Sequence, residues 1–274
     1  MSKILIQANN LGKKFCRRLR RSLWYGALDI GADLLARNRA QESPRLRKEE
    51  FWALSQVDFE LKEGECLGLI GRNGAGKTTL LKIINNLMKP DTGFIKIRGR
   101  IGALIALGAG FNPLLSGREN VYVNGAVLGL TKKEVETGME EILDFAGIGD
   151  FIDAPVQSYS SGMAVRLGFA IATRFSPNVI LLDEVLAVGD FGFQSKCLAR
   201  INELKRAGVA SILVSHNMPH ITQYADRCLW LENGAVHQEG ETKKMAREFL
   251  QFCQEQENPG QGKQADGWRY AFGP

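Results

Sequence analysis

The sequence predicts an α/β fold, because short apolar strands alternate with amphipathic helices along most of the chain. Strands are expected at 57–62, 65–70, 94–98, 178–183, 210–214 and 227–240, and helices at 77–88 and 165–175. The last of these strand regions contains Asn233-Gly234, a pair that favours the two-residue turn of a β-hairpin. An α/β core in one large domain follows from this alternation.

Two regions depart from the alternation. Residues 117–175 read as mostly helical and predict a helical subdomain inserted between core strands. Its apolar positions are Val121, Val127, Leu128, Val135, Ile142, Leu143, Leu167 and Ile171. Residues 16–50 form a second insertion. We therefore expect one domain over 1–252, with the helical subdomain at about 112–175, and a flexible polar tail over 253–274.

Residues 71–78 read GRNGAGKT, which matches the pattern G-x-x-x-x-G-K-[ST] between an apolar strand and a helix. Glycines let the backbone curl, so that successive N–H groups and the positive end of the helix point at phosphate groups. The residues expected to contact the nucleotide are Gly71, Arg72, Asn73, Gly74, Ala75, Gly76, Lys77, Thr78 and Thr79. Lys77 is expected to reach the β- and γ-phosphates of ATP, and the Thr78 hydroxyl to bind Mg²⁺. A chance glycine-rich turn is the alternative, and the flanking strand and helix argue against it.

An apolar strand at 178–183 ends in two carboxylates, Asp183 and Glu184. Phosphoryl transfer to water needs a ligand for Mg²⁺ and a group that orients the attacking water. We assign the metal role to Asp183 and the catalytic role to Glu184. A strand that ends in acidic residues is common by itself. Its position after a phosphate loop in the sequence is what indicates a catalytic site.

Residues 159–163 read YSSGM and precede a helix, and Ser160 lies 23 residues before Asp183 (183 − 160). At this point the sequence resembles the ABC ATPase family, which has L-S-G-G-Q at this place and differs at the first, third and fifth positions. The resemblance implies a P-loop NTPase core with an antiparallel β subdomain and an inserted α-helical subdomain. It also implies that Ser160 and Gly162 contact the γ-phosphate of ATP held by a second copy of the chain.

Further residues carry family roles by the same resemblance. Asp190 falls where the family has an aspartate loop at the dimer interface, and His216 where it has a catalytic switch histidine that contacts the γ-phosphate. The family's coupling glutamine is missing, because Ala106 and Leu107 occupy the expected place. Phe15 best matches the aromatic residue that stacks on adenine, and Trp52 is the competing candidate. Either ring could instead be core.

Residues 103–130, together with YSSGM, 183–190 and FWAL at 51–54, are similar to one branch of the family, the exporters of lipid-linked polysaccharides. The branch implies an O-antigen-like substrate, with capsule or teichoic acid as alternatives, and partners that are a second ATPase subunit and two copies of a membrane permease. The insertion carries part of a basic cluster, Lys13, Lys14, Arg17, Arg18, Arg20 and Arg21, beside apolar positions at helical spacing. Such a segment could approach an anionic membrane surface or pack on the ATPase core with its charges in solvent.

Composition argues against several other classes of protein, namely membrane-spanning, secreted, disulfide-rich and metal-cluster proteins. The chain has 45% hydrophobic residues and a net charge of +5, and no stretch is long and apolar enough for a membrane-spanning helix. The N-terminus lacks the pattern of a secretory signal, so we expect a cytoplasmic protein. The exporter resemblance implies a peripheral position on the cytoplasmic face of the inner membrane. Five scattered cysteines and three histidines predict neither a disulfide framework nor a metal cluster. The expected cofactors are therefore ATP and its Mg²⁺.

Two rival functions remain open. A soluble ABC-type ATPase that acts on nucleic acid would use the basic cluster, although no second cassette or long coiled coil is present and we expect no nucleic-acid partner. A regulatory module could bind ATP without hydrolysing it, and the intact Asp183-Glu184 pair argues against that reading. Salt-sensitive binding to RNA or DNA without a membrane partner would favour the first rival, and phosphate release from ATP would decide against the second.

Overall fold

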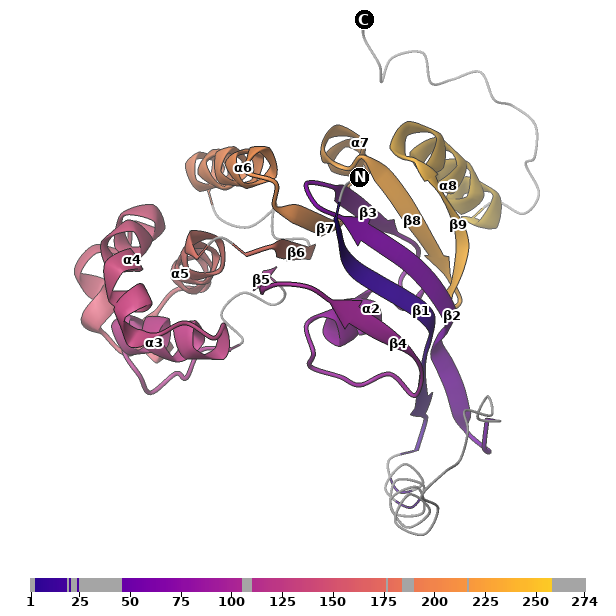
Figure 1. Cartoon of the computed structure of the whole chain (residues 1–274), viewed down its shortest axis with the longest axis horizontal. Helices are drawn as coiled ribbons and strands as arrows, with labels where there is room; N and C mark the ends of the chain where they lie inside the picture. Colours follow the sequence, from indigo (N-terminus) through magenta and orange to yellow (C-terminus); the bar gives the residue numbers. More distant parts are fainter. Residues whose placement is uncertain are drawn as a thin grey trace, which may run out of the picture.

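The computed structural model describes residues 3–18, 20, 24, 46–104, 110–175, 177–183, 190–215 and 217–257. These residues form two β-sheets with helices packed around them and a separate group of helices at one side (Figure 1). The α/β prediction is confirmed.

The larger sheet has six strands in the order β5-β6-β7-β3-β8-β9. These strands are β3 (Cys66–Ile70), β5 (Ile101–Leu104), β6 (Val179–Asp183), β7 (Ala210–Val214), β8 (Arg227–Glu232) and β9 (Ala235–Glu241). The five strands from β5 to β8 are parallel, and β9 runs antiparallel to β8. Strands β3 and β7 are buried along their whole length, which explains their continuous apolar sequences. The expected hairpin is confirmed, because β8 and β9 are joined at Asn233 and Gly234.

The smaller sheet has three antiparallel strands in the order β2-β1-β4. They are β1 (Ile4–Cys16), β2 (Glu50–Lys62) and β4 (Thr92–Ile97). The pairing of β1 with β2 extends as far as Cys16 and Glu50, and it contains several bulges. This long ribbon is the antiparallel β subdomain that the family resemblance implies.

The helices separate into two groups. Helices α3 (Gly117–Val127), α4 (Lys132–Ala146) and α5 (Ser161–Arg174), with short 3-10 turns η1 (Gly149–Asp153) and η2 (Val156–Ser158), lie together at the left of Figure 1. Helices α2 (Lys77–Ile84), α6 (Phe191–Arg206), α7 (Met218–Tyr224) and α8 (Thr242–Glu257) pack around the strands. Capping boxes at Ser116 and Thr131 fix the starts of α3 and α4, because each hydroxyl accepts a backbone bond and each Glu returns one.

Three apolar cores hold these layers together. One lies between the two sheets and includes α2, and a second lies on the other face of the large sheet under α6, α7 and α8. The third is internal to the helical subdomain and contains five of the apolar positions named above, Val121, Val135, Ile142, Leu167 and Ile171. Val127, another of those positions, is not part of this core. Its side chain, in the last turn of α3, is 81% exposed.

The carboxyl-terminal boundary also differs from the expected one. Helix α8 continues past 252 as far as Glu257, because Phe252 and Cys253 keep contact with the core. The Phe252 ring lies 5.0 Å from the Trp230 ring, measured between centroids. The rest of the expected tail, 258–274, lies outside the described residues. Among the helices that the structure describes, none combines the length and the apolar character that a bilayer crossing demands.

Candidate nucleotide-binding site

The expected phosphate loop connects the end of β3 to the start of α2. Gly71, Gly74 and Gly76 have φ angles of 150°, 81° and 107°, a region that L side chains rarely adopt. A Cβ at Gly76 would also lie 2.6 Å from the Ala53 carbonyl oxygen, and one at Gly71 would collide with the Leu231 carbonyl. All three glycines are therefore required by the curl of the loop, and Gly71 and Gly76 are also required by the closeness of neighbouring strands.

Lys77, the first residue of α2, is buried, and its side chain turns back over the loop. Its ammonium group donates hydrogen bonds to the carbonyls of Gly71 at 2.5 Å and Arg72 at 3.0 Å. No acidic residue lies in the first turn of α2, so the positive end of the helix is not neutralised there. Loop and helix together make an environment suited to phosphate oxygens.

The turn between β8 and β9 is hydrogen-bonded to the phosphate loop. The N–H of Gly234 donates to the Ala75 carbonyl at 3.1 Å, and the Gly234 carbonyl accepts from the N–H of Ser55 at 2.7 Å. Gly234 has a φ of 81°, and a Cβ there would lie 2.7 Å from the Ala53 carbonyl oxygen. The expected hairpin turn thus has a second role, because it links β2 to the phosphate loop.

Asp183 ends β6 at the same edge of the sheet. It pairs with Val214 of β7, and Val214 pairs with Leu69 of β3, so the carboxylate-bearing strand is two places from the strand that leads into the loop. With strands about 4.8 Å apart, these backbones are separated by ~10 Å. The carboxyl ends of parallel strands are where open α/β sheets bind ligands. Glu184 and His216, which follow β6 and β7, lie outside the described residues.

Ser160 is the N-cap of α5. Its Oγ accepts a hydrogen bond from the N–H of Met163 at 3.2 Å, and the first turn of the helix contains no acidic residue. Ser160 is exposed and Gly162 is half-buried, and a Cβ at Gly162 would meet no atom closer than 3.8 Å. The helix start is therefore open to solvent and carries an unopposed positive end, which suits an anion.

Asp190 is the N-cap of α6 rather than a free loop residue. Its carboxylate accepts from the N–H of Phe193 at 2.9 Å and forms an ion pair with Arg166 of α5. The backbone bond from Phe193, followed by the Arg166 charge, lowers the pKa of Asp190. Arg166 also lies over the Phe193 ring, 5.1 Å from its centroid. Sequence reasoning missed Arg166, because it lies 24 positions from Asp190 on a different helix and no local pattern links the two residues.

The two candidate adenine-stacking residues lie on opposite faces of the β1–β2 ribbon. Phe15 pairs with Phe51, whereas Trp52 pairs with the neighbouring Lys14, and side chains alternate along a strand. The Phe15 and Phe51 rings are 6.3 Å apart between centroids, and Trp52 packs against Gly12. Only one of the two rings can therefore face a given ligand. Ala106 and Leu107, the residues at the expected glutamine position, lie outside the described residues.

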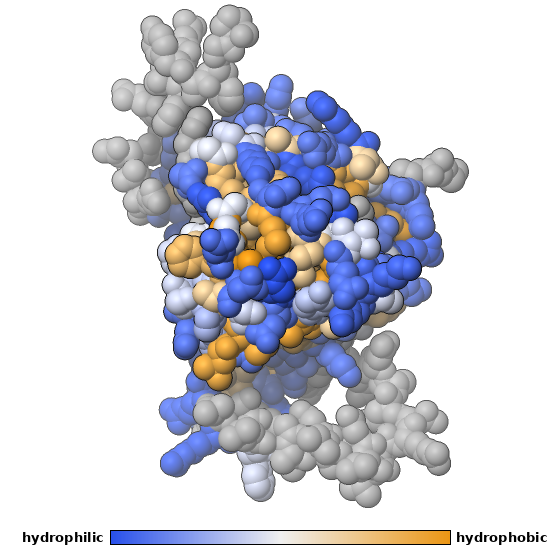
Figure 2. Space-filling model, turned by 90° about the vertical axis from the view of Figure 1, so that its left-hand side faces the viewer, coloured by the Kyte–Doolittle hydropathy of each residue, from blue (hydrophilic) through white to orange (hydrophobic). Residues whose placement is uncertain are grey.

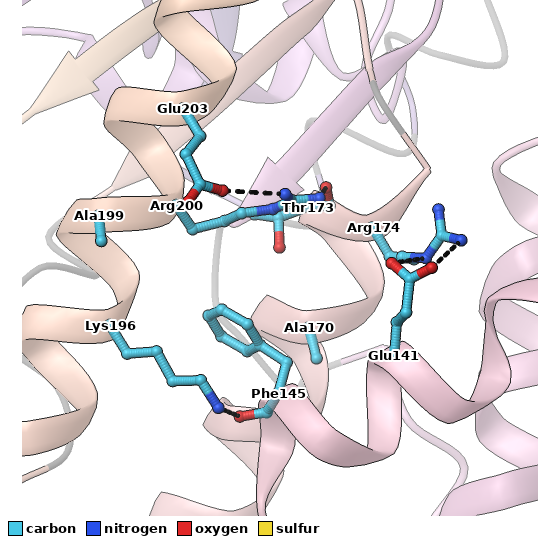
Figure 3. Close-up of a pocket in the computed structure, with 9 residues that line it drawn as sticks. All are labelled: Glu141, Phe145, Ala170, Thr173, Arg174, Lys196, Ala199, Arg200 and Glu203. Atoms are coloured by element: carbon cyan, nitrogen blue, oxygen red, sulfur yellow. Dashed lines mark hydrogen bonds and ion pairs between the residues drawn. The ribbon is translucent and has the colours of Figure 1, made fainter.

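A pocket of about 250 Å³ lies away from the phosphate loop, between α4, α5 and α6 (Figure 3). Its cations are already engaged by groups on its walls. Lys196 donates to the carbonyls of Asp144 and Phe145, both at 3.0 Å, and Arg200 donates to the Thr173 carbonyl at 3.1 Å. These bonds hold the helical subdomain against α6.

Comparisons with known proteins agree with this geometry. Residues 54–187 match the family described as ABC transporter. The O-antigen export system ATP-binding protein RfbB of Klebsiella pneumoniae is 42% identical over 206 residues, covering 75% of this chain and 84% of that protein. The chain belongs to the ABC transporter family. It is an ATP-binding cassette of that family, and it binds nucleotide and hydrolyses ATP.

Other relatives of this ABC ATPase have related names. The ABC transporter protein AbcA of Aeromonas salmonicida is 45% identical over 207 residues, 76% of this chain and 67% of that protein. The teichoic acids export ATP-binding protein TagH of Lactococcus lactis is 38% identical over 256 residues, which are 92% of this chain and 52% of that longer protein.

Solved structures show the same fold. A dimeric ATP-binding cassette in a post-hydrolysis state, bound to ADP and phosphate, matches with a TM-score of 0.66 and 22% identity over 87% of this chain and 99% of that chain. The ATP-binding subunit of an ABC transporter matches with a TM-score of 0.69 and 23% identity, over 90% of this chain and 93% of that chain. The expected P-loop NTPase architecture of the ABC ATPases is therefore confirmed.

Proposed function

We propose that this ABC ATPase works as a homodimer on the cytoplasmic face of the inner membrane, where it powers export of a lipid-linked, O-antigen-like polysaccharide through separate permease subunits. The observation that carries the proposal is the 42% identity to an O-antigen export ATP-binding protein across 84% of that protein. Teichoic acid remains an alternative substrate because of the TagH relative, and capsular polysaccharide is a second alternative.

The phosphate loop holds the triphosphate of ATP in this account. Backbone N–H groups of Gly71–Thr78 surround the phosphates, Lys77 neutralises their charge, and Thr79 contacts them from the first turn of α2. The buried position of Lys77 beside the Gly71 carbonyl supports this role, because the ammonium lies over the loop already. Phe15 stacks on the adenine.

Thr78 and Asp183 are the residues that would hold Mg²⁺. One hydroxyl and one carboxylate are hard oxygen ligands of the kind this ion prefers, and each lies at the carboxyl edge of the large sheet. Mg²⁺ neutralises charge on the β- and γ-phosphates when it is bound. Glu184 orients the attacking water, and His216 contacts the γ-phosphate.

A second copy of the chain completes each site. Ser160 and Gly162 of one subunit face the ATP on the phosphate loop of the other, and Asp190 lies near the dimer axis. The start of α5 supports this arrangement, because it is exposed and its first turn has no acidic residue to oppose the positive end of the helix. ATP then joins the two subunits, and hydrolysis lets them separate.

The permease docks on the helical subdomain in this proposal. Four apolar side chains are strongly exposed there: Leu114 at 74%, Val123 at 42%, Val127 at 81% and Phe151 at 57%. Figure 2 looks at this side of the molecule and shows apolar areas among the charged side chains. A protein partner buries exposed apolar side chains of this kind, and a membrane partner that reaches the ATPase needs such a surface.

Deletion of the gene in its native host tests the export function. The expected result is loss of the polymer from the cell surface and accumulation of its lipid-linked form inside the cell. Wild-type protein should restore export, and Lys77→Ala should not. Normal surface polymer in the deletion strain would contradict the proposed substrate class, and undiminished rescue by Lys77→Ala would contradict the role of ATP.

A further inference from the structure

Tyr159 immediately precedes Ser160, and its side chain points away from α5 toward the turns before it. Its hydroxyl donates a hydrogen bond to the Phe151 carbonyl at 2.7 Å. The ring is half-buried and packs against the core of the helical subdomain. Burial raises the pKa of Tyr159, so the hydroxyl stays protonated and remains a donor. The start of α5 is thus anchored from its N-terminal side.

The segment that Tyr159 is anchored to is itself attached to the start of α3. The N–H of Val156 donates to the Leu115 carbonyl at 2.9 Å, and the N–H of Gln157 donates to the Pro113 carbonyl at 3.0 Å. Arg118 binds both carboxylate oxygens of Asp153, at 2.7 and 3.0 Å. Residues 113–118 and 151–157 are therefore joined by hydrogen bonds into one layer, which we call the α3–η1 layer.

Gly117 shows how closely the tyrosine fits this layer. A Cβ at Gly117 would collide with the Tyr159 hydroxyl and would lie 3.0 Å from Cδ1 of Ile152. Gly117 is the first residue of α3 and is buried, so its lack of a side chain makes room for the hydroxyl. The same layer carries the exposed apolar residues Leu114 and Phe151.

We propose that Tyr159 is a positioning residue, whose hydroxyl fixes Ser160 relative to the α3–η1 layer and so sets how well Ser160 meets the ATP of a second subunit. The inference rests on the proposed function, in which Ser160 contacts that ATP. Tyr159 itself touches no phosphate. It acts through the backbone of the next residue, and it makes the position of Ser160 depend on the layer that faces the permease.

The test compares Tyr159→Phe with wild type in ATP turnover by the purified full chain. Loss of one hydrogen bond of ordinary strength should raise the ATP concentration for half-maximal turnover about three- to tenfold. The rate at saturating ATP should change less, and binding of a fluorescent ATP analogue to the monomer should not change, because the phosphate loop is untouched. A residue with only a packing role would lower the thermal unfolding midpoint and leave the ATP dependence unaltered.

Ser158→Ala is the matched control. Its hydroxyl donates to the Pro155 carbonyl at 2.6 Å, a bond local to the η2 turn, whereas the Tyr159 hydroxyl reaches back to Phe151. We expect wild-type ATP dependence for this variant. Gly117→Ala disturbs the Tyr159 hydroxyl from the other side and should shift the ATP dependence in the same direction as Tyr159→Phe. The double variant Gly117→Ala/Tyr159→Phe should raise the ATP concentration for half-maximal turnover no further than Gly117→Ala does, since the phenylalanine lacks the colliding oxygen.

The outcomes separate the inference from the proposed function. Wild-type turnover with an unchanged ATP dependence in both Tyr159→Phe and Gly117→Ala would overturn the role of Tyr159 alone. A wild-type chain that hydrolyses ATP but never associates through it would overturn the proposed dimer and this inference together. An equal shift in Ser158→Ala would also overturn the inference, because the effect would then belong to the whole turn.

Discussion

The N–H of Gly234 donates a hydrogen bond to the carbonyl of Ala75 at 3.1 Å, and this bond connects the β8–β9 turn to the phosphate loop. The two residues are far apart in the sequence, yet the turn closes one side of the loop. The Gly234 carbonyl also accepts a hydrogen bond from the N–H of Ser55 in the antiparallel sheet. The turn therefore connects that sheet to the residues that surround the phosphates. The loop is therefore supported by both sheets.

Gly234→Ala should disturb this support. The alanine would have to adopt a φ of 81° with its Cβ 2.7 Å from the Ala53 carbonyl oxygen, so we expect a loss of about 2–4 kcal/mol in the free energy of unfolding. Nucleotide affinity should fall as well. Gly208→Ala is the control, because Gly208 has a similar φ of 86° and its Cβ would meet nothing closer than 4.0 Å.

Gly208→Ala should cost only about 1 kcal/mol, the strain of the left-handed conformation, and leave affinity unchanged. Urea unfolding and a titration with fluorescent nucleotide measure both quantities. Equal effects of the two substitutions would show that the contact between the turn and the loop has no influence on the site.

Lys77→Ala should weaken ATP binding about 10- to 100-fold, because a buried ammonium that makes charge-assisted bonds to phosphate is lost. Lys82→Ala on the same helix is the control, since Lys82 is exposed in the last turn of α2 and is expected to leave binding unchanged. The measurement is a nucleotide titration at equilibrium. An affinity that does not depend on Lys77 would contradict the assignment of the loop.

Asp190 predicts a pH effect. Its pKa is lowered in the folded chain by the Phe193 N–H and by Arg166, so its contribution to stability is present above the unfolded value of about 3.9 and is lost as the pH falls through the lower folded value. Asp190→Asn keeps an oxygen for the cap but removes the charge. We therefore expect its urea midpoint to fall less than that of wild type between about pH 5 and pH 3.

Asp150→Asn serves as the control for this series, because Asp150 is an exposed carboxylate at the start of η1. Glu119, Glu134 and Asp153 also have lowered pKa values and remain in every variant, so the comparison isolates Asp190. If the urea midpoints of wild type and Asp190→Asn fell equally with pH, the bonds from Phe193 and Arg166 would not stabilise the fold.

The elements that sequence alone predicted best are those with a strong local pattern. The strand into Gly71, the helix from Lys77 and the Asn233-Gly234 turn each depend on a few neighbouring residues, and all three are confirmed. Local pattern does not separate buried from exposed apolar residues near a helix end, as Val127 in the last turn of α3 shows with an exposure of 81%.

Contacts between distant segments were beyond reach of the sequence. Nothing near Asp190 shows that Arg166 pairs with it, and nothing near Ala75 shows that Gly234 lies beneath the loop. The choice between Phe15 and Trp52 depended on strand register, which bulges in β1 and β2 shift by single residues. In such a ribbon, the pairing of the two strands decides which face a side chain lies on, and alternation within one strand does not suffice.

The central claim is that ATP on the phosphate loop of one chain is completed by Ser160 of another. Sedimentation of Glu184→Gln with and without Mg·ATP tests it most directly, because this variant should bind ATP without turning it over. We predict a monomer without nucleotide and a dimer with it, and no dimer when Lys77→Ala is added. A monomer at saturating ATP, or a dimer that forms regardless of ATP, would contradict the account.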